Sequence, residues 1–172
     1  MIFNLKIVKV CSEYCDYLRQ FDNRVVYNKN EKELRPFIGI LFKIEDIEYF
    51  APLSSPKPKH QRMKNTLDFF KIKDGKLVAI NFNNMIPVNK TNYSLIDLEK
   101  ETLTLNEQKY QKLLREQLDW LNTNYYQVRK KSFKLYEKYN NGTLPKNIME
   151  RCCNFKLLEI KCSEYNMLNL KL

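Results

Sequence analysis

The stretch FIGILFKIEDIEYFAPL, residues 37–53, decides the fold class more than any other part of the chain. Two apolar runs flank the pair Glu45 and Asp46, and this arrangement predicts a β-hairpin. Gly39 lies inside the first run, which suggests a bulge or a close approach by another part of the backbone. Pro52 has no N–H to donate, so strand pairing should end there or lie at a sheet edge.

Other strands and helices are expected on both sides of this hairpin. Apolar runs that predict strands occur at residues 2–10, 66–72, 77–82 and 84–88. Helical spacing predicts helices from about residue 106, at 125–139, and after Asn154 as a capping residue. Strands that precede helices in this way favour an α+β fold over βαβ units.

A short helix should follow the first strand. The Ser12 side chain can accept a hydrogen bond from the free N–H groups at a helix start. Tyr14, Leu18 and Phe21 fall on one helical face, so spacing alone makes Tyr14 a core aromatic. The polar connection at residues 22–36 is long enough to be functional or mobile.

The composition of the chain restricts the classes of protein to which it can belong. The 172 residues favour a single domain, residues 1–172, and the net charge of +10 favours a polyanionic partner over a membrane surface. No apolar run approaches the roughly 20 residues of a transmembrane helix, and the start does not read as a signal peptide. The five cysteines match neither disulfide nor zinc spacing, which predicts free thiols in a reducing cytoplasm and no metal or other cofactor.

The segment APLSSPKPKH, residues 51–60, directly follows the predicted hairpin. No acidic residue lies between Glu48 and Asp68. The cations in that interval are Lys57, Lys59, Arg62 and Lys64. No glycine is present, so the segment is not a nucleotide-binding P-loop. His60 is the only histidine, and a lone exposed histidine more often has no role than a catalytic one.

The helix predicted at 125–139 is a second basic segment. Its cations are Arg129, Lys130, Lys131, Lys134 and Lys138. One basic helix is often only a solvated face. Two basic segments in one small domain instead favour a groove that follows a nucleic-acid backbone.

Cleavage of RNA without a metal would suit the first basic segment. RNA supplies its own nucleophile, the 2′-OH, and fixed cations with hydroxyl donors can stabilise the charged phosphate. Lysine or tyrosine can transfer the proton if its pKa is shifted. Ser54, Ser55 and Lys57 directly follow a strand end, which is a rigid base for such a site. A non-catalytic RNA-binding protein that sequesters messages explains the charge and the aromatic residues equally well.

Beyond these patterns, the chain resembles the ToxN/AbiQ family, endoribonuclease toxins of type III toxin–antitoxin systems that act in abortive infection against phages. The matching segments, in order along the chain, are EYCDYLRQFDNRV, RPFIGILFKI, YFAPLSSPK, MIPV, SLIDL and CNFKLLE. The resemblance implies a twisted antiparallel sheet like the barrel core of the Kid/MazF toxins, with added helices. It also implies sequence-selective cleavage to 2′,3′-cyclic phosphate and 5′-hydroxyl ends in the bacterial cytoplasm. The implied inhibitor is a small repeated, pseudoknotted RNA in a closed assembly with the toxin.

The same resemblance implies a catalytic set. Its members are Tyr14, Arg35, Ser54, Ser55, Lys57 and His60. In this interpretation Arg35 and Lys57 stabilise the phosphate, and the two serines position it. Tyr14 or Lys57 would carry the proton, because arginine is a poor proton donor. The predicted RNA-contacting set is Lys59, Arg62, Lys64 and the five cations of the helix at 125–139.

Overall fold

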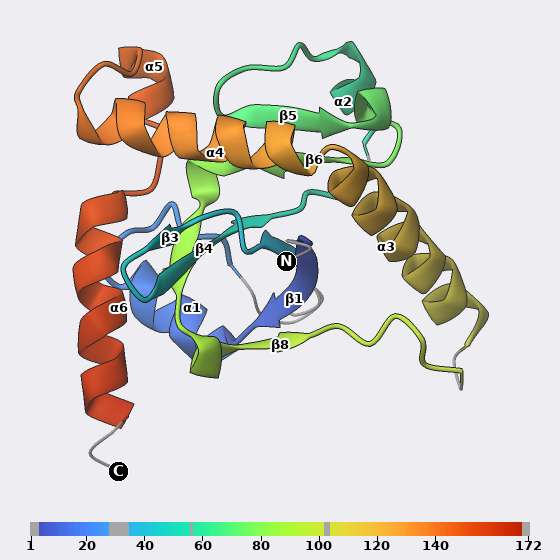
Figure 1. Ribbon diagram of the computed structural model, residues 1–172, viewed down its shortest axis with the longest axis horizontal. Helices are drawn as coiled ribbons and strands as arrows, with labels where there is room; N and C mark the ends of the chain where they lie inside the picture. Colours follow the sequence, from blue (N-terminus) through green and yellow to red (C-terminus); the bar gives the residue numbers. More distant parts are fainter. Residues whose placement is uncertain (1–3, 28–34, 56, 102–103, 170–172) are drawn as a thin grey trace.

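The structure, a computed structural model, describes residues 4–27, 35–55, 57–101 and 104–169. Its strands are β1 (Lys6–Val10), β2 (Phe37–Gly39), β3 (Lys43–Ile44), β4 (Ile47–Pro52), β5 (Phe69–Ile72), β6 (Val78–Asn81), β7 (Ile86–Val88) and β8 (Tyr93–Leu95). Its helices are α1 (Ser12–Arg19), α2 (Pro58–Arg62), α3 (Leu105–Thr123), α4 (Tyr125–Asn140), α5 (Lys146–Met149) and α6 (Phe155–Asn169). Strands therefore dominate the first part of the chain and helices the last third, as the α+β prediction requires (Figure 1).

The strands form one six-stranded sheet and a separate hairpin. The larger sheet runs in the order β3-β4-β2-β1-β8, and β7 pairs with the other edge of β4. Its strand pairs are antiparallel. The hairpin β5–β6 joins the end of β4 through a bridge between Leu53 and Ile80.

The predicted hairpin at residues 37–53 is confirmed, but its first arm is broken. Glu45 and Asp46 form the turn between β3 and β4, and Glu45 has a φ of 53°. Residues 40–42 interrupt the first arm between β2 and β3. The break lies beside Gly39, where a Cβ would come within 2.3 Å of the Phe50 ring. An aromatic side chain, rather than another backbone segment, therefore requires glycine at this position. Strand β4 ends at Pro52, as predicted, although Leu53 still forms backbone hydrogen bonds to both sides.

The sheet is not closed, so the predicted barrel core of the Kid/MazF type is not confirmed. β7, on the other edge of β4, and β8 are the outer strands of the sheet, and no pairing between described residues joins them. Closure needs strands long enough to tilt and stagger around an axis. β7 and β8 have three residues each, so neither outer strand is long enough to wrap around an axis and pair with the other.

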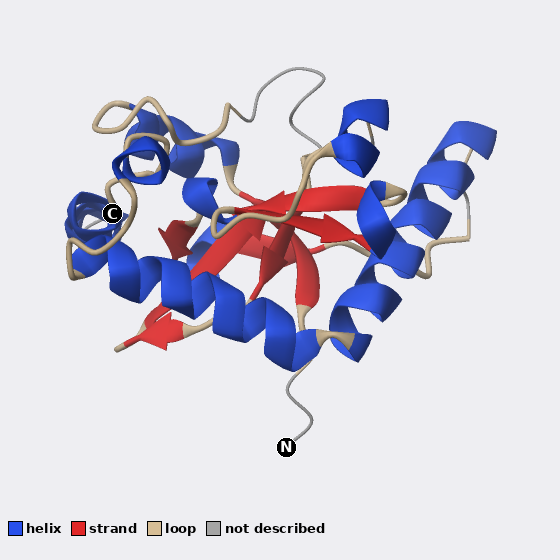
Figure 2. Ribbon diagram, turned by 90° about the horizontal axis from the view of Figure 1, so that it is seen from above, coloured by secondary structure: helices blue, strands red, loops and turns tan. Residues whose placement is uncertain are grey.

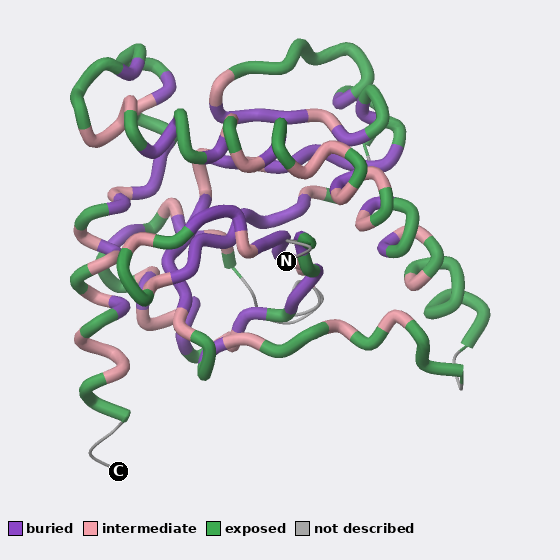
Figure 3. The backbone as a smooth tube through the Cα atoms, viewed as in Figure 1, coloured by how far each residue is buried: buried purple, intermediate pink, exposed green. Residues whose placement is uncertain are grey.

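The helices surround the strands and complete the core (Figure 2). α6 packs on β7 and α1, and α3 contacts β1 and β5. Buried side chains from β1 through α6 form one connected hydrophobic cluster. Figure 3 shows this burial along the strands, with exposed residues along the outer faces of α3 and α6. In the ranges that the structure describes, no helix is both long and apolar enough to cross a membrane.

Local signals at the helix ends were partly correct. The Asn154 side chain accepts the Leu157 N–H at 3.2 Å, which confirms the predicted cap of α6. Ser12 is not the cap of α1, because the helix already includes it and Cys11 takes the cap position. Phe21 lies beyond the last residue of α1 and is 39% exposed, so it leaves the predicted apolar face.

Candidate functional site

The end of β4 lies beside the segment that carries Arg35. Phe37 pairs with Pro52, and the Leu53 N–H donates to the Pro36 carbonyl at 2.9 Å. One further step of this antiparallel register places Arg35 opposite Ser54. We call Arg35, Ser54, Ser55 and Lys57 the loop site.

Ser54 is fixed to the neighbouring hairpin. Its backbone N–H and its hydroxyl both donate to the Ala79 carbonyl, at 3.0 Å and 3.1 Å. The hydroxyl proton is therefore engaged, whereas the oxygen lone pairs can still accept a hydrogen bond. Ser55 and Lys57 are exposed, and neither side chain has a partner in the described part of the chain. The loop site thus has a rigid base and two free donors.

Helix α2 fixes the other end of the loop site. The Lys57 carbonyl accepts the His60 N–H at 2.9 Å. The His60 ring packs edge-on against Phe69, with ring centroids 5.7 Å apart. Gly75 has a φ of +84°, and a Cβ there would lie 2.7 Å from the His60 carbonyl oxygen. This close contact holds α2 against the turn at Lys73–Gly75, so the backbone of Lys57 is fixed on its far side as well.

His60 is buried, which corrects the expectation that it is exposed. It is 4% exposed, and its Nδ1 has no hydrogen-bond partner in the described ranges. Burial, with Lys59 and Lys57 nearby, lowers the pKa of the imidazole. The ring is therefore neutral near pH 7 and lies beneath the loop rather than on it.

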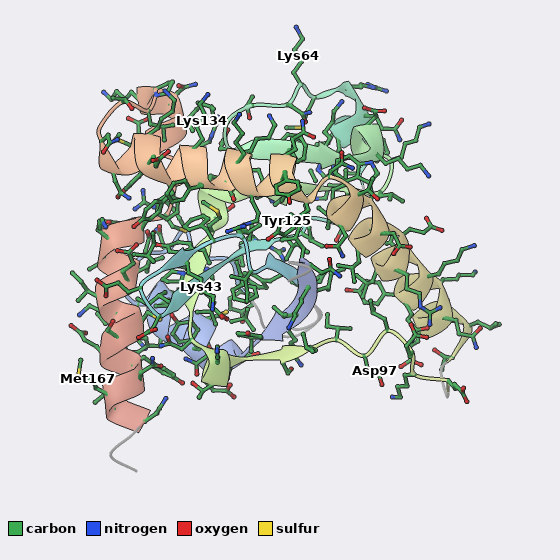
Figure 4. The ribbon with its side chains drawn as sticks, viewed as in Figure 1. Lys43, Lys64, Asp97, Tyr125, Lys134 and Met167 are labelled. Carbon is green, nitrogen blue, oxygen red and sulfur yellow. The ribbon has the colours of Figure 1, made fainter. Side chains whose placement is uncertain are left out.

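The loop site is strongly positive. Burial lowers the pKa of the Arg35 guanidinium, which nevertheless stays charged near neutral pH. Lys59, Arg62 and Lys64 are exposed around α2, and Figure 4 shows Lys64 pointing away from the molecule. The first acid that follows these cations along the chain, Asp68, does not offset them. It is buried and forms an ion pair with Arg151 at 2.8 Å. This distribution suits a phosphate ligand.

Tyr14 does not join the loop site. Its side chain is fully buried, and its hydroxyl donates to the Pro87 carbonyl at 2.7 Å. Pro87 pairs with Tyr49, and Ser54 follows five residues later, about 16 Å along an extended strand. Burial, followed by the nearby Cys162, raises the pKa of the phenol well above its ordinary value. The geometry gives Tyr14 a structural partner, and its catalytic role stays a prediction.

The cations of α4 divide into two groups. Arg129 donates from Nε to the Leu41 carbonyl at 2.6 Å, and the Lys131 ammonium lies 5.0 Å from the centre of the Phe70 ring. Both are therefore engaged within the protein, and Lys138 is half-buried. Lys130 and Lys134 are exposed, without hydrogen bonds or ion pairs to the described residues. Lys130 and Lys134 thus present exposed, unoccupied charges on the described surface of α4, and Lys138 presents a partly exposed one, which leaves these three as the RNA-contacting candidates of the helix.

Two aromatic residues on the same helix were missed from the sequence. Tyr126 is 84% exposed and Phe133 is 38% exposed. Their separation of seven residues, two helical turns, was the available signal. Aromatic residues at helical spacing are usually buried in the core, so the sequence did not predict that these two would be exposed.

The thiols and acids do not form a second reactive centre in the described ranges. All five cysteines are free, and all but Cys11 are buried. Burial raises the pKa of Cys152 to about 12, so its reactive thiolate is scarce at neutral pH. No three His, Cys, Asp or Glu side chains of the described residues come together as metal ligands.

The chain resembles known proteins in both sequence and fold. The family model for toxin ToxN of the type III toxin–antitoxin system matches residues 6–163. Endoribonuclease ToxN from Bacillus thuringiensis subsp. kurstaki is 33% identical, covering 94% of this chain and 84% of the relative. Endoribonuclease AbiQ from Lactococcus lactis subsp. lactis is 30% identical, covering 94% of this chain and 90% of AbiQ.

A solved structure agrees with these matches. It comes from work on type III toxin–antitoxin mechanism and selective toxin inhibition by a non-coding RNA pseudoknot. It aligns with a TM-score of 0.78 at 31% identity, covering 95% of this chain and 99% of the other. The chain therefore belongs to the ToxN family of type III toxin–antitoxin toxins.

Proposed function

We propose that this endoribonuclease cuts RNA at the loop site, using the 2′-OH of its substrate as the nucleophile and no metal ion. One observation carries the proposal. Lys57 is an exposed cation without a described partner, between a strand end and a fixed helix, and Arg35 lies on the segment that runs beside that strand end. Free donors on a rigid base are what stabilisation of a pentavalent phosphate requires.

In the proposed reaction, the 2′-oxygen attacks the adjacent phosphorus and the bond from phosphorus to the 5′-oxygen breaks. The 2′-OH loses its proton, and the leaving 5′-oxygen gains one. The products are a 2′,3′-cyclic phosphate and a 5′-hydroxyl. Arg35 and Lys57 offset the charge that develops on the phosphate oxygens. Ser55 donates a further hydrogen bond, and Ser54 holds the backbone in place through Ala79.

Lys57 is the titratable side chain of the loop site best placed to transfer a proton. Arg35 stays protonated in proteins, and neither serine is a practical base without one beside it. Tyr14 is buried away from the loop, and its raised pKa makes its phenolate scarce near neutral pH. We therefore assign Tyr14 a structural role at the contact between α1 and β7, and His60 a role in supporting α2.

The same proposal includes the partner and the setting. Family membership and the pseudoknot reported for a structural neighbour support a small, repeated, pseudoknotted RNA as the inhibitor, in a closed protein–RNA assembly. The exposed cations Lys59, Arg62 and Lys64 extend the positive surface beyond the loop site, where RNA backbone can follow. The proposed setting is the bacterial cytoplasm, where the toxin acts in defence against phages.

To test this proposal, end-labelled RNA is incubated with the protein in excess EDTA. Discrete shorter products ending in a cyclic phosphate are expected. The same RNA with 2′-O-methyl groups should be bound but remain intact, because it has no nucleophile. Cleavage of the methylated RNA, or loss of activity in EDTA that a divalent ion restores, contradicts the proposed chemistry. If unmodified RNA is shifted on a native gel but stays intact under all conditions, the protein binds RNA without cleaving it.

A further inference from the structure

The outer face of α4 exposes aromatic rings between cations. Tyr126, at 84% exposed, is more exposed than any other large apolar side chain in the described ranges. Phe133, on the same stripe two turns later, is 38% exposed. Tyr126 therefore contributes little to the core, whereas Phe133 packs one side of its ring on the buried Phe42, with centroids 5.3 Å apart, and exposes the rest.

Both rings rest on a rigid backing. Tyr126 contacts Tyr125 edge-to-face, with centroids 5.3 Å apart. Arg129 holds Tyr125 in turn, through a 3.0 Å hydrogen bond to its hydroxyl and a guanidinium 5.4 Å from its ring centre. The Phe133 ring is 6.2 Å from the Tyr136 ring and nearly parallel to it, at 21°. Phe133, packed on both Tyr136 and Phe42, therefore loses little conformational entropy on binding a ligand, whereas Tyr126 is supported along one edge only.

The cations lie at matching positions along the helix. Lys130 follows Tyr126 by four residues, and Lys134 follows Lys130 by four. Residues at this spacing share a helical face, and the two rings are separated by about 10 Å along the axis. Neither ammonium is paired within the described part of the chain. The stripe therefore offers alternating flat apolar faces and free positive charges.

We infer that this α4 stripe, Tyr126, Lys130, Phe133 and Lys134, is a stacking platform for unpaired nucleotides of an RNA that the protein binds without cutting. Aromatic faces bind single strands because every base has a flat face to stack on them, and cations bind the phosphates between bases. A duplex hides its base faces, so it gains only the electrostatic part. The inference rests on the proposed RNA-binding function.

The platform is separate from the loop site. His60 of α2 packs on Phe69, whereas Lys131 of α4 lies over Phe70. Consecutive residues of a strand point to opposite faces, so α2 and α4 cover opposite faces of the β5–β6 hairpin. Figure 2 shows strands between the long helix α4 and the short helix α2. The nucleotides next to a cut at Lys57 therefore do not contact the platform. An RNA bound at both places must extend around the protein.

The test measures the affinity of full-length protein for two fluorescent probes by anisotropy. One is a short single-stranded 2′-O-methyl oligouridine, and the other is a blunt 2′-O-methyl RNA duplex of the same length. The variants are Tyr126→Ala, Tyr126→Phe and, as a matched exposed apolar control on α3, Leu105→Ala, at a side chain that is 75% exposed. Tyr126→Ala should weaken single-strand binding about ten-fold, within the roughly 5- to 150-fold range expected for one stacked base. Tyr126→Phe and Leu105→Ala should bind like wild type, and duplex affinity should be unchanged.

The outcomes separate this inference from the proposed function. If Tyr126→Ala binds the single strand like wild type, or weakens the duplex equally, the stacking platform is overturned while RNA binding stands. If wild type binds neither probe but still cleaves RNA in EDTA, the platform is overturned and the proposed function stands; if it neither binds nor cleaves, the proposed function itself fails. Cleavage of a short unmodified RNA should proceed at the wild-type rate in Tyr126→Ala. If the cleavage rate falls together with the single-strand affinity, the RNA that is cut lies on α4. That result would overturn the inference that the platform binds RNA that is not cut.

Discussion

Arg129 donates a 2.6 Å hydrogen bond from its Nε to the main-chain carbonyl of Leu41. Leu41 lies in the break between β2 and β3, and its N–H is satisfied by the Tyr49 carbonyl at 3.0 Å. The carbonyl points away from the ladder, toward α4. A buried carbonyl needs a partner, and Arg129 provides it. A residue of the basic helix thus stabilises the hairpin on which the fold depends.

This contact predicts that Arg129→Ala destabilises the protein by about 1–3 kcal/mol, the usual effect of leaving a buried polar group unpaired. For a chain of this size that lowers the Tm by roughly 2–4 °C per kcal/mol. Lys130→Ala, one position later on the exposed face, is the matched control and should stay within about 0.5 kcal/mol of wild type. Equal Tm values for the two variants, measured by circular dichroism, would contradict the division of α4 into structural and free cations.

A second prediction concerns Tyr14→Phe, which keeps the ring and removes the hydroxyl. The Pro87 carbonyl loses its 2.7 Å donor, so the unfolding free energy should fall by about 0.5–1.5 kcal/mol. Single-turnover cleavage by the folded variant should stay close to the wild-type rate. A large fall in that rate, with unchanged stability, would restore Tyr14 to the catalytic set.

The third prediction concerns pH and His60. Its folded-state pKa lies below 6.5, its ordinary value, because burial opposes the charged form. Between these two values the unfolded chain binds more protons than the folded one, so stability rises with pH. The Tm of wild type should therefore fall as the pH drops below about 6.5. His60 is the only histidine, so His60→Gln should remove most of that fall.

Thermal scans at several values between about pH 5 and pH 7.5 would measure the effect, in a range where carboxylates and lysines titrate little. The wild-type and His60→Gln curves should approach each other toward the acid end. Parallel curves would show that the imidazole is not buried in its neutral form.

The fourth prediction tests the requirement for glycine at the break in the hairpin. In Gly39→Ala the new methyl group would lie 2.3 Å from the Phe50 ring, which is fully buried and cannot move freely. Overpacking of this kind costs about 1–3 kcal/mol. Phe50→Leu creates room, so the double variant should be more stable than the sum of the two single changes implies. Strict additivity in urea titrations would exclude the clash as the cause.

Much of the fold could be predicted from the sequence where the signal is local. The hairpin turn at Glu45, the strand end at Pro52 and the cap at Asn154 each follow from the chemistry of a few neighbouring residues. Strand β8 was missed, because Tyr93–Leu95 is three residues long and no alternation can be read over that length. Sheet closure depends on pairing between distant strands, which local patterns do not specify.

The candidate site could be predicted only in part, for the same reason. The hydroxyl pair and Lys57 follow directly from a strand end, and the register then places Arg35 beside them. Burial of His60 could not be predicted, because it depends on Phe69 and the turn at Lys73–Gly75 packing over α2. The partner of Arg129 was equally hidden, since Leu41 is 88 residues away along the chain.

The most direct test of the central claim is the single-turnover cleavage rate of Lys57→Ala in EDTA. Lys64→Ala is the matched control, an exposed lysine near α2 that lies outside the loop site. Loss of one charge-stabilising donor typically slows the chemical step by about 10²–10³. We expect that fall for Lys57→Ala, with a wild-type Tm, and a rate within a few-fold of wild type for Lys64→Ala. A folded Lys57→Ala protein that cleaves RNA at the wild-type rate would contradict the assignment of the loop site as the catalytic centre.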